Sequence, residues 1–205
     1  MPRTTSVKII QEDHMIDGLD SGIRLHIREK RPRGLKRFEE AGTILLCHGQ
    51  SMPAPITYDI RIPGYSWMDY MATRGFDVFA LSIRGYGLST RQPELQAPRL
   101  ANPPAGRGHV AMRDIEAAVR FIQNRRSLDR INLLGYSFST TTTAAFTAAN
   151  NARIRRLAIY APFYAYERPE LAAQSEDPAH PGRLDPNFGA WRWVRPRITE
   201  NLRWQ

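Results

Sequence analysis

The chain has 205 residues, 42% of them hydrophobic and 24% charged, values close to those of soluble globular domains. It carries 29 basic and 20 acidic residues, a formal net charge of +9 at pH 7. The excess is mostly arginine scattered along the chain, and no zinc, RRM or helix-turn-helix pattern accompanies it, so we expect no nucleic-acid partner. The densest basic stretch, residues 28–37, contains proline and glycine and is predicted to be a solvated loop.

Signals for export and membrane insertion are weak in this sequence. No apolar stretch of the kind found in secretory signals follows Met1, and no run approaches the roughly 18 apolar residues of a membrane span. We therefore expect a cytoplasmic protein without a membrane partner. The single cysteine, Cys47, excludes an internal disulfide framework, and its apolar neighbours predict a buried thiol.

The first forty residues are predicted to be rich in β-structure. Apolar and polar residues alternate over residues 7–15 and 23–27, as they do in half-buried strands. These two segments predict an N-terminal hairpin at one edge of a sheet. The continuous apolar run at residues 43–47 is typical of a central strand that is covered on both faces.

Strands and helices then alternate as far as residue 162. The segments are a helix at 67–73, a strand at 76–81, an amphipathic helix at 110–125, a strand at 131–134, a helix at 140–149 and a strand at 154–160. This alternation predicts an α/β fold with a mostly parallel sheet and helices on both faces. Residues 92–104 form a proline-rich loop, residues 167–187 show little periodicity, and residues 198–205 resemble the start of a helix.

The segment Gly135-Tyr136-Ser137-Phe138-Ser139 lies between a predicted strand and a predicted helix. Strand, sharp turn and helix form the context of the nucleophile elbow of serine hydrolases, whose pattern is G-x-S-x-G. Small residues are needed on both sides of the nucleophile because the turn brings backbone segments close together. Ser139 stands in place of the second glycine. By itself, Ser137 is also consistent with a serine in a turn or at a helix N-cap, which is the commoner place of a serine before a helix.

Two further segments, in the same order, make the chain resemble the capped α/β-hydrolases. Leu45-Leu46-Cys47-His48-Gly49-Gln50 is similar to the turn after the third strand of that family. The residues from Ser82 to Ser89 are similar to its D-x-R-G-x-G-x-S segment, with Ser82 where the family commonly has Asp. The resemblance covers roughly residues 6–163. It implies a core at residues 1–163, the N-terminal portion of that fold, and a partial cap segment at residues 164–205.

The resemblance implies hydrolysis of a small ester or related acyl compound through Ser137. The backbone N–H groups of Gln50 and Phe138 are then the two donors of an oxyanion hole. The supporting residues of the elbow and of the loop are Gly135, Ser139, His48 and Gly49. Neither a metal nor an organic cofactor is implied. The tryptophans of the cap segment, Trp191 and Trp193, are equally consistent with substrate contact and with core packing.

The acid and the histidine that should follow Ser137 are not found. His180 is the only later histidine; it lies three residues after Asp177 in a proline-rich segment, and Glu167 is a further acid without a histidine. Two interpretations stay open. The chain is a serine hydrolase with an incomplete, truncated triad, or it is a non-catalytic interaction module with this fold. The sequence does not indicate the oligomeric state.

Overall fold

The computed structural model describes residues 7–162 and 176–189. The chain divides into two compact units. The first unit comprises Met1–Arg91 and Gly108–Ala165, and the second comprises Gln92–Arg107 and Tyr166–Gln205. The central sheet and the segments that resemble the hydrolase motifs belong to the first unit.

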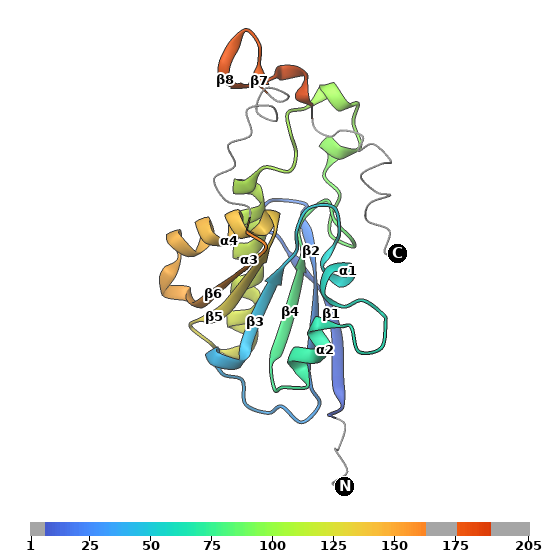
Figure 1. The fold of residues 1–205 in the computed structure, drawn as a ribbon, viewed down its shortest axis with the longest axis vertical. Helices are drawn as coiled ribbons and strands as arrows, with labels where there is room; N and C mark the ends of the chain where they lie inside the picture. The colour runs from blue at the N-terminus through green and yellow to red at the C-terminus, as the bar shows by residue number, and fades with distance from the viewer. Residues whose placement is uncertain (1–6, 163–175, 190–205) are drawn as a thin grey trace. The chain divides into compact units, whose positions relative to one another are not determined.

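A six-stranded sheet runs through the first unit in the order β1-β2-β4-β3-β5-β6 (Figure 1). Its strands are β1 (Ile9–Asp17), β2 (Arg24–Pro32), β3 (Thr43–Cys47), β4 (Asp77–Ser82), β5 (Ile131–Tyr136) and β6 (Ile154–Tyr160). The β1–β2 and β2–β4 pairs are antiparallel, whereas β3 pairs in parallel with β4 and β5, and β5 with β6. The predicted N-terminal hairpin and mostly parallel sheet are confirmed.

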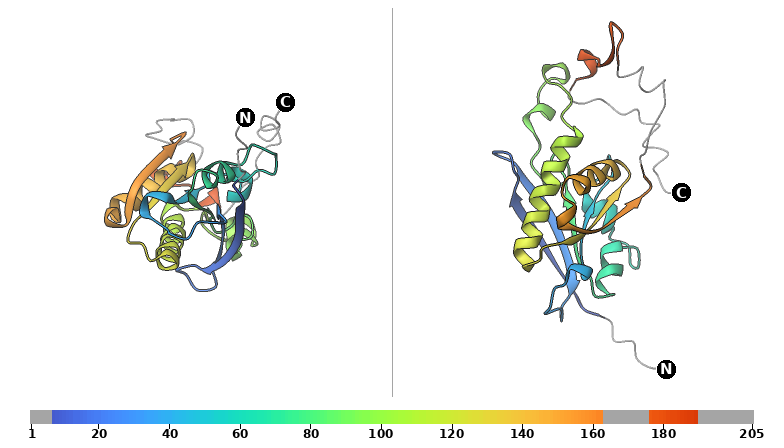
Figure 2. Two further views of the ribbon diagram at one scale, coloured as in Figure 1. Left: turned by 90° about the horizontal axis from the view of Figure 1, so that it is seen from below. Right: turned by 90° about the vertical axis from the view of Figure 1, so that its left-hand side faces the viewer.

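Helices cover both faces of this sheet, as predicted. They are α1 (Ala54–Tyr58), α2 (Trp67–Ala72), α3 (Gly108–Arg126) and α4 (Phe138–Ala149). Helices α3 and α4 lie on one face, and α1 and α2 lie on the other (Figure 2). Alternate residues of the strands therefore enter two cores. Leu45 and Leu133 pack towards α3 and α4, whereas Leu46 and Leu134 belong to the core beneath α1 and α2. Two short 3-10 turns, Glu40–Gly42 and Asn151–Arg153, precede β3 and β6.

The predicted solvated loop at residues 28–37 is wrong for its first half, which lies within β2. Arg28 and Lys30 are both buried there. Arg28 donates to Asp13 at 2.9 Å and to Asp59 at 3.0 Å, and Lys30 Nζ donates to Asp59 at 2.5 Å and to Asp69 at 2.8 Å. The cations are buried because acids from other elements meet them, and an alternating charged strand does not reveal those partners in sequence.

The second unit contains short elements. They are the 3-10 turns Pro93–Leu95, Arg99–Ala101 and Pro186–Phe188 and the antiparallel strands β7 (Glu176–Asp177) and β8 (His180–Leu184). This hairpin was not predicted, because so short a segment has no measurable periodicity. The Arg99 guanidinium donates to the backbone carbonyl of Asn187 at 2.8 Å. Trp191, Trp193 and the helix start predicted at 198–205 lie outside the described residues. None of the described helices is both long enough and apolar enough to cross a membrane.

Candidate functional site

Ser137 occupies the turn between β5 and α4 with φ 51° and ψ −117°. A positive φ is unfavourable for a residue with a Cβ, so this backbone is strained. The conformation is held in place because the Ser137 N–H donates to the carbonyl of Tyr160, at the end of β6, at 3.0 Å. The hydroxyl does not cap α4, and it has no hydrogen-bond partner among the residues that the structure describes.

Two glycines permit the chain segments around Ser137 to approach one another. A Cβ added at Gly135 would lie 2.6 Å from the backbone carbonyl of Ser139 and would also collide with Thr143 Oγ1. A Cβ added at Gly49 would lie 3.0 Å from the Cβ of Ser137. The loop after β3 and the turn after β5 therefore touch at the carboxyl end of the sheet. The chain leaves β3 for β4 on one side and reaches β5 on the other, and such a point is where ligands bind in open α/β sheets.

Ser139 and His48 link these two segments. The buried hydroxyl of Ser139 donates to the backbone carbonyl of His48. Nδ1 of the imidazole donates to the Gly49 carbonyl at 2.6 Å, and Nε2 accepts from the backbone N–H of Ile83 at 3.1 Å. Both ring nitrogens are thus engaged by backbone groups of the loop after β3 and of the end of β4. Neither nitrogen is available to take a proton from Ser137.

Burial lowers the pKa of His48 to about 4, although its hydrogen bond to Gly49 opposes that shift. The imidazole is therefore neutral at pH 7, consistent with Nε2 acting as an acceptor. The ring of Tyr86 contacts it edge-on, with centroids 4.7 Å apart. A neutral, fully bonded histidine fixes the loop rather than supplying charge to a ligand.

The resemblance assigns two backbone N–H groups, those of Gln50 and Phe138, to an oxyanion hole. Among the described residues, neither the Gln50 nor the Phe138 N–H has an acceptor outside regular secondary structure, and Phe138 is the first residue of α4. Next to Gln50, Ser51 has a φ of 81°, and its N–H donates to the Tyr86 hydroxyl at 3.5 Å. The loop is therefore fixed in shape, and within the described part of the chain these two N–H groups have no acceptor.

The turn after β4 is fixed by a buried ion pair. Asp114 of α3 accepts from the backbone N–H and from the guanidinium of Arg84, both at 2.9 Å, and Arg84 also donates to Asp20 at 2.6 Å. Asp114 has no exposed surface. The hydroxyl of Ser82, which stands at the Asp position of the D-x-R-G-x-G-x-S pattern, is buried without a hydrogen-bond partner in the described structure. A polar contact is thus missing at that position.

The remaining candidates for an acid and a base belong to the second unit. His180 Nδ1 and Asp177 Oδ2 lie 2.8 Å apart at its surface, which fixes the ring orientation. Hydrogen bonding by His180 also keeps the pKa of Asp177 below its usual value. Glu167 lies outside the described residues. Within the described part of the first unit, neither a histidine nor a carboxylate forms a hydrogen bond with the Ser137 hydroxyl.

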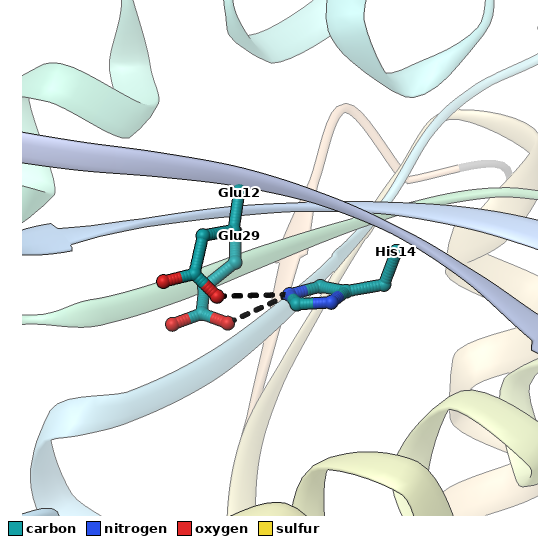
Figure 3. A group of neighbouring side chains, drawn as sticks. All are labelled: Glu12, His14 and Glu29. Carbon is teal, nitrogen blue, oxygen red and sulfur yellow. Dashed lines mark hydrogen bonds and ion pairs between the residues drawn. The ribbon is translucent and has the colours of Figure 1, made fainter.

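Glu12, His14 and Glu29 bring three possible metal-ligand atoms within 4.8 Å of one another (Figure 3). Three arginines already form ion pairs with these carboxylates. Arg125 bonds Glu29 at 3.0 Å and Glu12 at 2.6 Å, Arg31 bonds Glu29 at 2.6 Å, and Arg126 bonds Glu29 as well. A divalent cation would face three guanidinium charges, so the cluster is an ion-pair network between β1, β2 and α3.

Tyr86 and Tyr160 contribute to the site, although the sequence does not indicate it. Tyr86 lies inside the motif after β4, but its contact with His48 is visible only in space. Tyr160 ends β6, and its carbonyl receives the Ser137 N–H. A backbone acceptor leaves no signature in sequence, so only the parallel pairing of β5 and β6 could have suggested it.

The family model described as alpha/beta hydrolase fold matches residues 42–193. Similar solved structures include an epoxide hydrolase of potato, Solanum tuberosum, with a TM-score of 0.54 and 20% identity, over 78% of this chain and 43% of that one. The epoxide hydrolase VrEH1 of Vigna radiata gives 0.52 and 15%, over 79% and 43%. The haloalkane dehalogenase DatA of Agrobacterium tumefaciens gives 0.52 and 14%, over 84% and 50%.

At these identities the solved structures establish the fold alone, and this chain spans less than half the length of both epoxide hydrolases. No curated protein sequence matches it significantly. The family model, however, covers most of the chain, including both loops that meet at Ser137. The chain therefore belongs to the alpha/beta hydrolase fold family.

Proposed function

We propose that this protein is a serine hydrolase of esters or related acyl compounds, with Ser137 as its nucleophile. The observation that carries this proposal is the strained backbone of Ser137, with a φ of 51° between β5 and α4, packed against Gly49 of the neighbouring loop. Strain at a serine with an unengaged hydroxyl is typical of a nucleophile elbow. The N–H groups of Gln50 and Phe138 are the proposed donors to the oxyanion of the tetrahedral intermediate.

The second interpretation, a module with this fold and without catalysis, is favoured by the surroundings of the hydroxyl. A serine hydroxyl is a weak nucleophile without a base, and His48 is committed to backbone partners. We therefore propose that this chain turns over its substrate slowly. We also propose that residues 1–163 form the core and that residues 164–205 form part of a cap.

The test is covalent labelling, because it needs one reaction with Ser137 rather than many turnovers. The purified chain is treated with a fluorophosphonate, and the modified peptide is identified by mass spectrometry. We expect one adduct on Ser137, lost in Ser137→Ala and retained in Ser127→Ala. Ser127 is a matched control because its φ of 53° is also positive. Absence of an adduct on Ser137, or labelling of several serines alike, overturns the proposal.

Turnover then tests the nucleophile and identifies the substrate class. We expect slow hydrolysis of p-nitrophenyl acetate that is lost in Ser137→Ala. Turnover that survives Ser137→Ala contradicts a nucleophilic role. Epoxides and haloalkanes complete the panel because the similar solved structures are named epoxide hydrolases and a dehalogenase. Preferential turnover of either class would contradict the ester assignment.

A further inference from the structure

Four aromatic side chains form a continuous row on the sheet face that carries α1 and α2. We call Tyr58, Trp67, Tyr160 and Tyr136 the aromatic row. Successive ring centroids are 6.2 Å apart for Tyr58 and Trp67, 5.4 Å for Trp67 and Tyr160, and 5.3 Å for the stacked pair Tyr160 and Tyr136. These spacings are those of interacting aromatic pairs. The row thus joins the start of α2 to the ends of β5 and β6.

The row is anchored at its ends and open in the middle. The Tyr58 ring is buried, and its hydroxyl donates to the carbonyl of Cys47 at 2.7 Å. Tyr136 packs against the core beneath α1 and α2. Trp67 and Tyr160, by contrast, are 40% and 51% exposed. Two large rings are therefore held in place by their neighbours and still present apolar surface to a ligand.

The row ends beside the proposed nucleophile. Tyr136 directly precedes Ser137, and the Tyr160 carbonyl accepts the Ser137 N–H at 3.0 Å. The position of an added Cβ at Gly49 is 3.0 Å from both the Tyr136 ring and the Ser137 Cβ. Ser137 and the Tyr136–Tyr160 end of the row thus lie together at the carboxyl ends of the neighbouring parallel strands β5 and β6, the edge at which ligands bind in open α/β sheets.

We propose that the aromatic row is the subsite for a planar, apolar group of the ester, such as an aryl ring. This inference rests on the proposed function and names its substrate class. A planar ring can stack on Trp67 and Tyr160 at a spacing like those within the row, whereas a saturated ring of equal size cannot. Rigid aromatic side chains lose little conformational freedom on binding, which favours such a site.

Binding is tested with ketones, which carry the carbonyl but no leaving group. Isothermal titration of the Ser137→Ala chain compares methyl 2-naphthyl ketone with methyl decalinyl ketone, its saturated counterpart. We expect about 10-fold tighter binding of the planar ketone, and loss of that preference in Trp67→Leu and Tyr160→Leu. Trp67→Phe should retain most of it, and Tyr65→Leu is the matched control because Tyr65 is an exposed aromatic outside the row.

Chemical shifts of the unsubstituted chain make the test independent of how the variants fold. The planar ketone should shift the ring protons of Trp67 and Tyr160 and leave those of Tyr65 unchanged. Equal affinity for the two ketones, or shifts elsewhere only, overturns the inference. If Ser137 is labelled but the planar ketone does not bind more tightly, the aromatic subsite is rejected and Ser137 remains the proposed nucleophile. If the planar ketone binds more tightly but Ser137 is not labelled, the proposed function is rejected and the aromatic row remains a binding surface.

Discussion

The hydroxyl of Ser139 donates a hydrogen bond to the backbone carbonyl of His48, which lies 91 positions earlier in the chain. The two residues belong to different segments that meet at Ser137, the turn after β5 and the loop after β3. At the position of the second glycine in the G-x-S-x-G pattern, this chain therefore has a side chain that links the two segments. The bond is buried, so its loss is not compensated by water.

Removing this hydroxyl should destabilise the fold measurably. Ser139→Ala leaves the His48 carbonyl without that donor, and we expect a loss of about 1–2 kcal/mol in the free energy of unfolding, measured by urea denaturation. Thr141→Ala is the matched control: its hydroxyl bonds a helix carbonyl at an exposed position, and its effect should stay below about 0.5 kcal/mol. Equal effects of the two changes would show that the buried Ser139 hydrogen bond stabilises the fold no more than an exposed one.

A side chain at Gly135 should not be tolerated. Gly135→Ala places a Cβ against Thr143 Oγ1 and 2.6 Å from the Ser139 carbonyl, and we expect a loss of at least about 2 kcal/mol in the free energy of unfolding. Gly34→Ala, whose added Cβ meets nothing within 4 Å, should be nearly neutral. The double variant Gly135→Ala/Thr143→Ala should recover only part of the loss, because the backbone carbonyl stays. Full recovery would contradict this account.

The elements of the first unit were predictable because their hydrophobic periods are regular. Residues 43–47 are a continuous apolar run and form β3 with those bounds, and the amphipathic segment 110–125 lies within α3. Residues 28–32 were predicted wrongly because burial of Arg28 and Lys30 depends on acids distant in sequence. The elbow context was visible from local spacing. The Ser139–His48 bond and the aromatic row were not, because both join segments that only the sheet brings together.

The buried pair of Arg84 and Asp114 should behave as a unit. Asp114→Ala leaves the Arg84 guanidinium with Asp20 alone, and we expect about 3 kcal/mol of destabilisation by urea denaturation. Replacing both, as Arg84→Met/Asp114→Leu, should recover more than half of that loss because no buried charge is left unpaired. A double variant as unstable as Asp114→Ala would show that the ion pair itself, rather than an uncompensated charge, sets the stability.

The low pKa of His48 makes the free energy of unfolding depend on pH in a predictable direction. Its pKa falls from 6.5 in the unfolded chain to about 4 in the fold, so between these values the unfolded chain binds a proton that the fold does not. The contribution of His48 to the free energy of unfolding is complete above pH 6.5. It decreases as pH falls towards 4, by roughly 3 kcal/mol in total. Burial raises the pKa of Asp77 to about 6, which acts in the opposite direction, so the total pH profile mixes both.

The His48 contribution is therefore measured on its own ring. Carbon-13 NMR of histidine side chains should give a His48 titration midpoint near pH 4, with the signal assigned by its absence in His48→Asn. The difference in unfolding free energy between the unsubstituted chain and His48→Asn should shrink as pH falls from 6.5 to 4. A midpoint at 6.5 or above would mean that the imidazole is not held neutral by burial, and the assignment of Nε2 as an acceptor would fail.

The open edge of the sheet at β6 should promote self-association. Among the described strands, β6 pairs with β5 alone, and its last residues, Ile159 and Tyr160, are 46% and 51% exposed. An edge strand with free backbone groups and apolar side chains is a template for pairing with another chain. We expect light scattering of the purified chain to show mass increasing with concentration. Ile159→Lys should suppress that increase, because a charged side chain on an edge strand opposes pairing.

Leu88→Lys, which adds the same charge at a 71% exposed apolar residue outside the strands, should leave the increase in mass unchanged. A concentration-independent monomer, or equal suppression by both lysines, would show that β6 is not the associating edge.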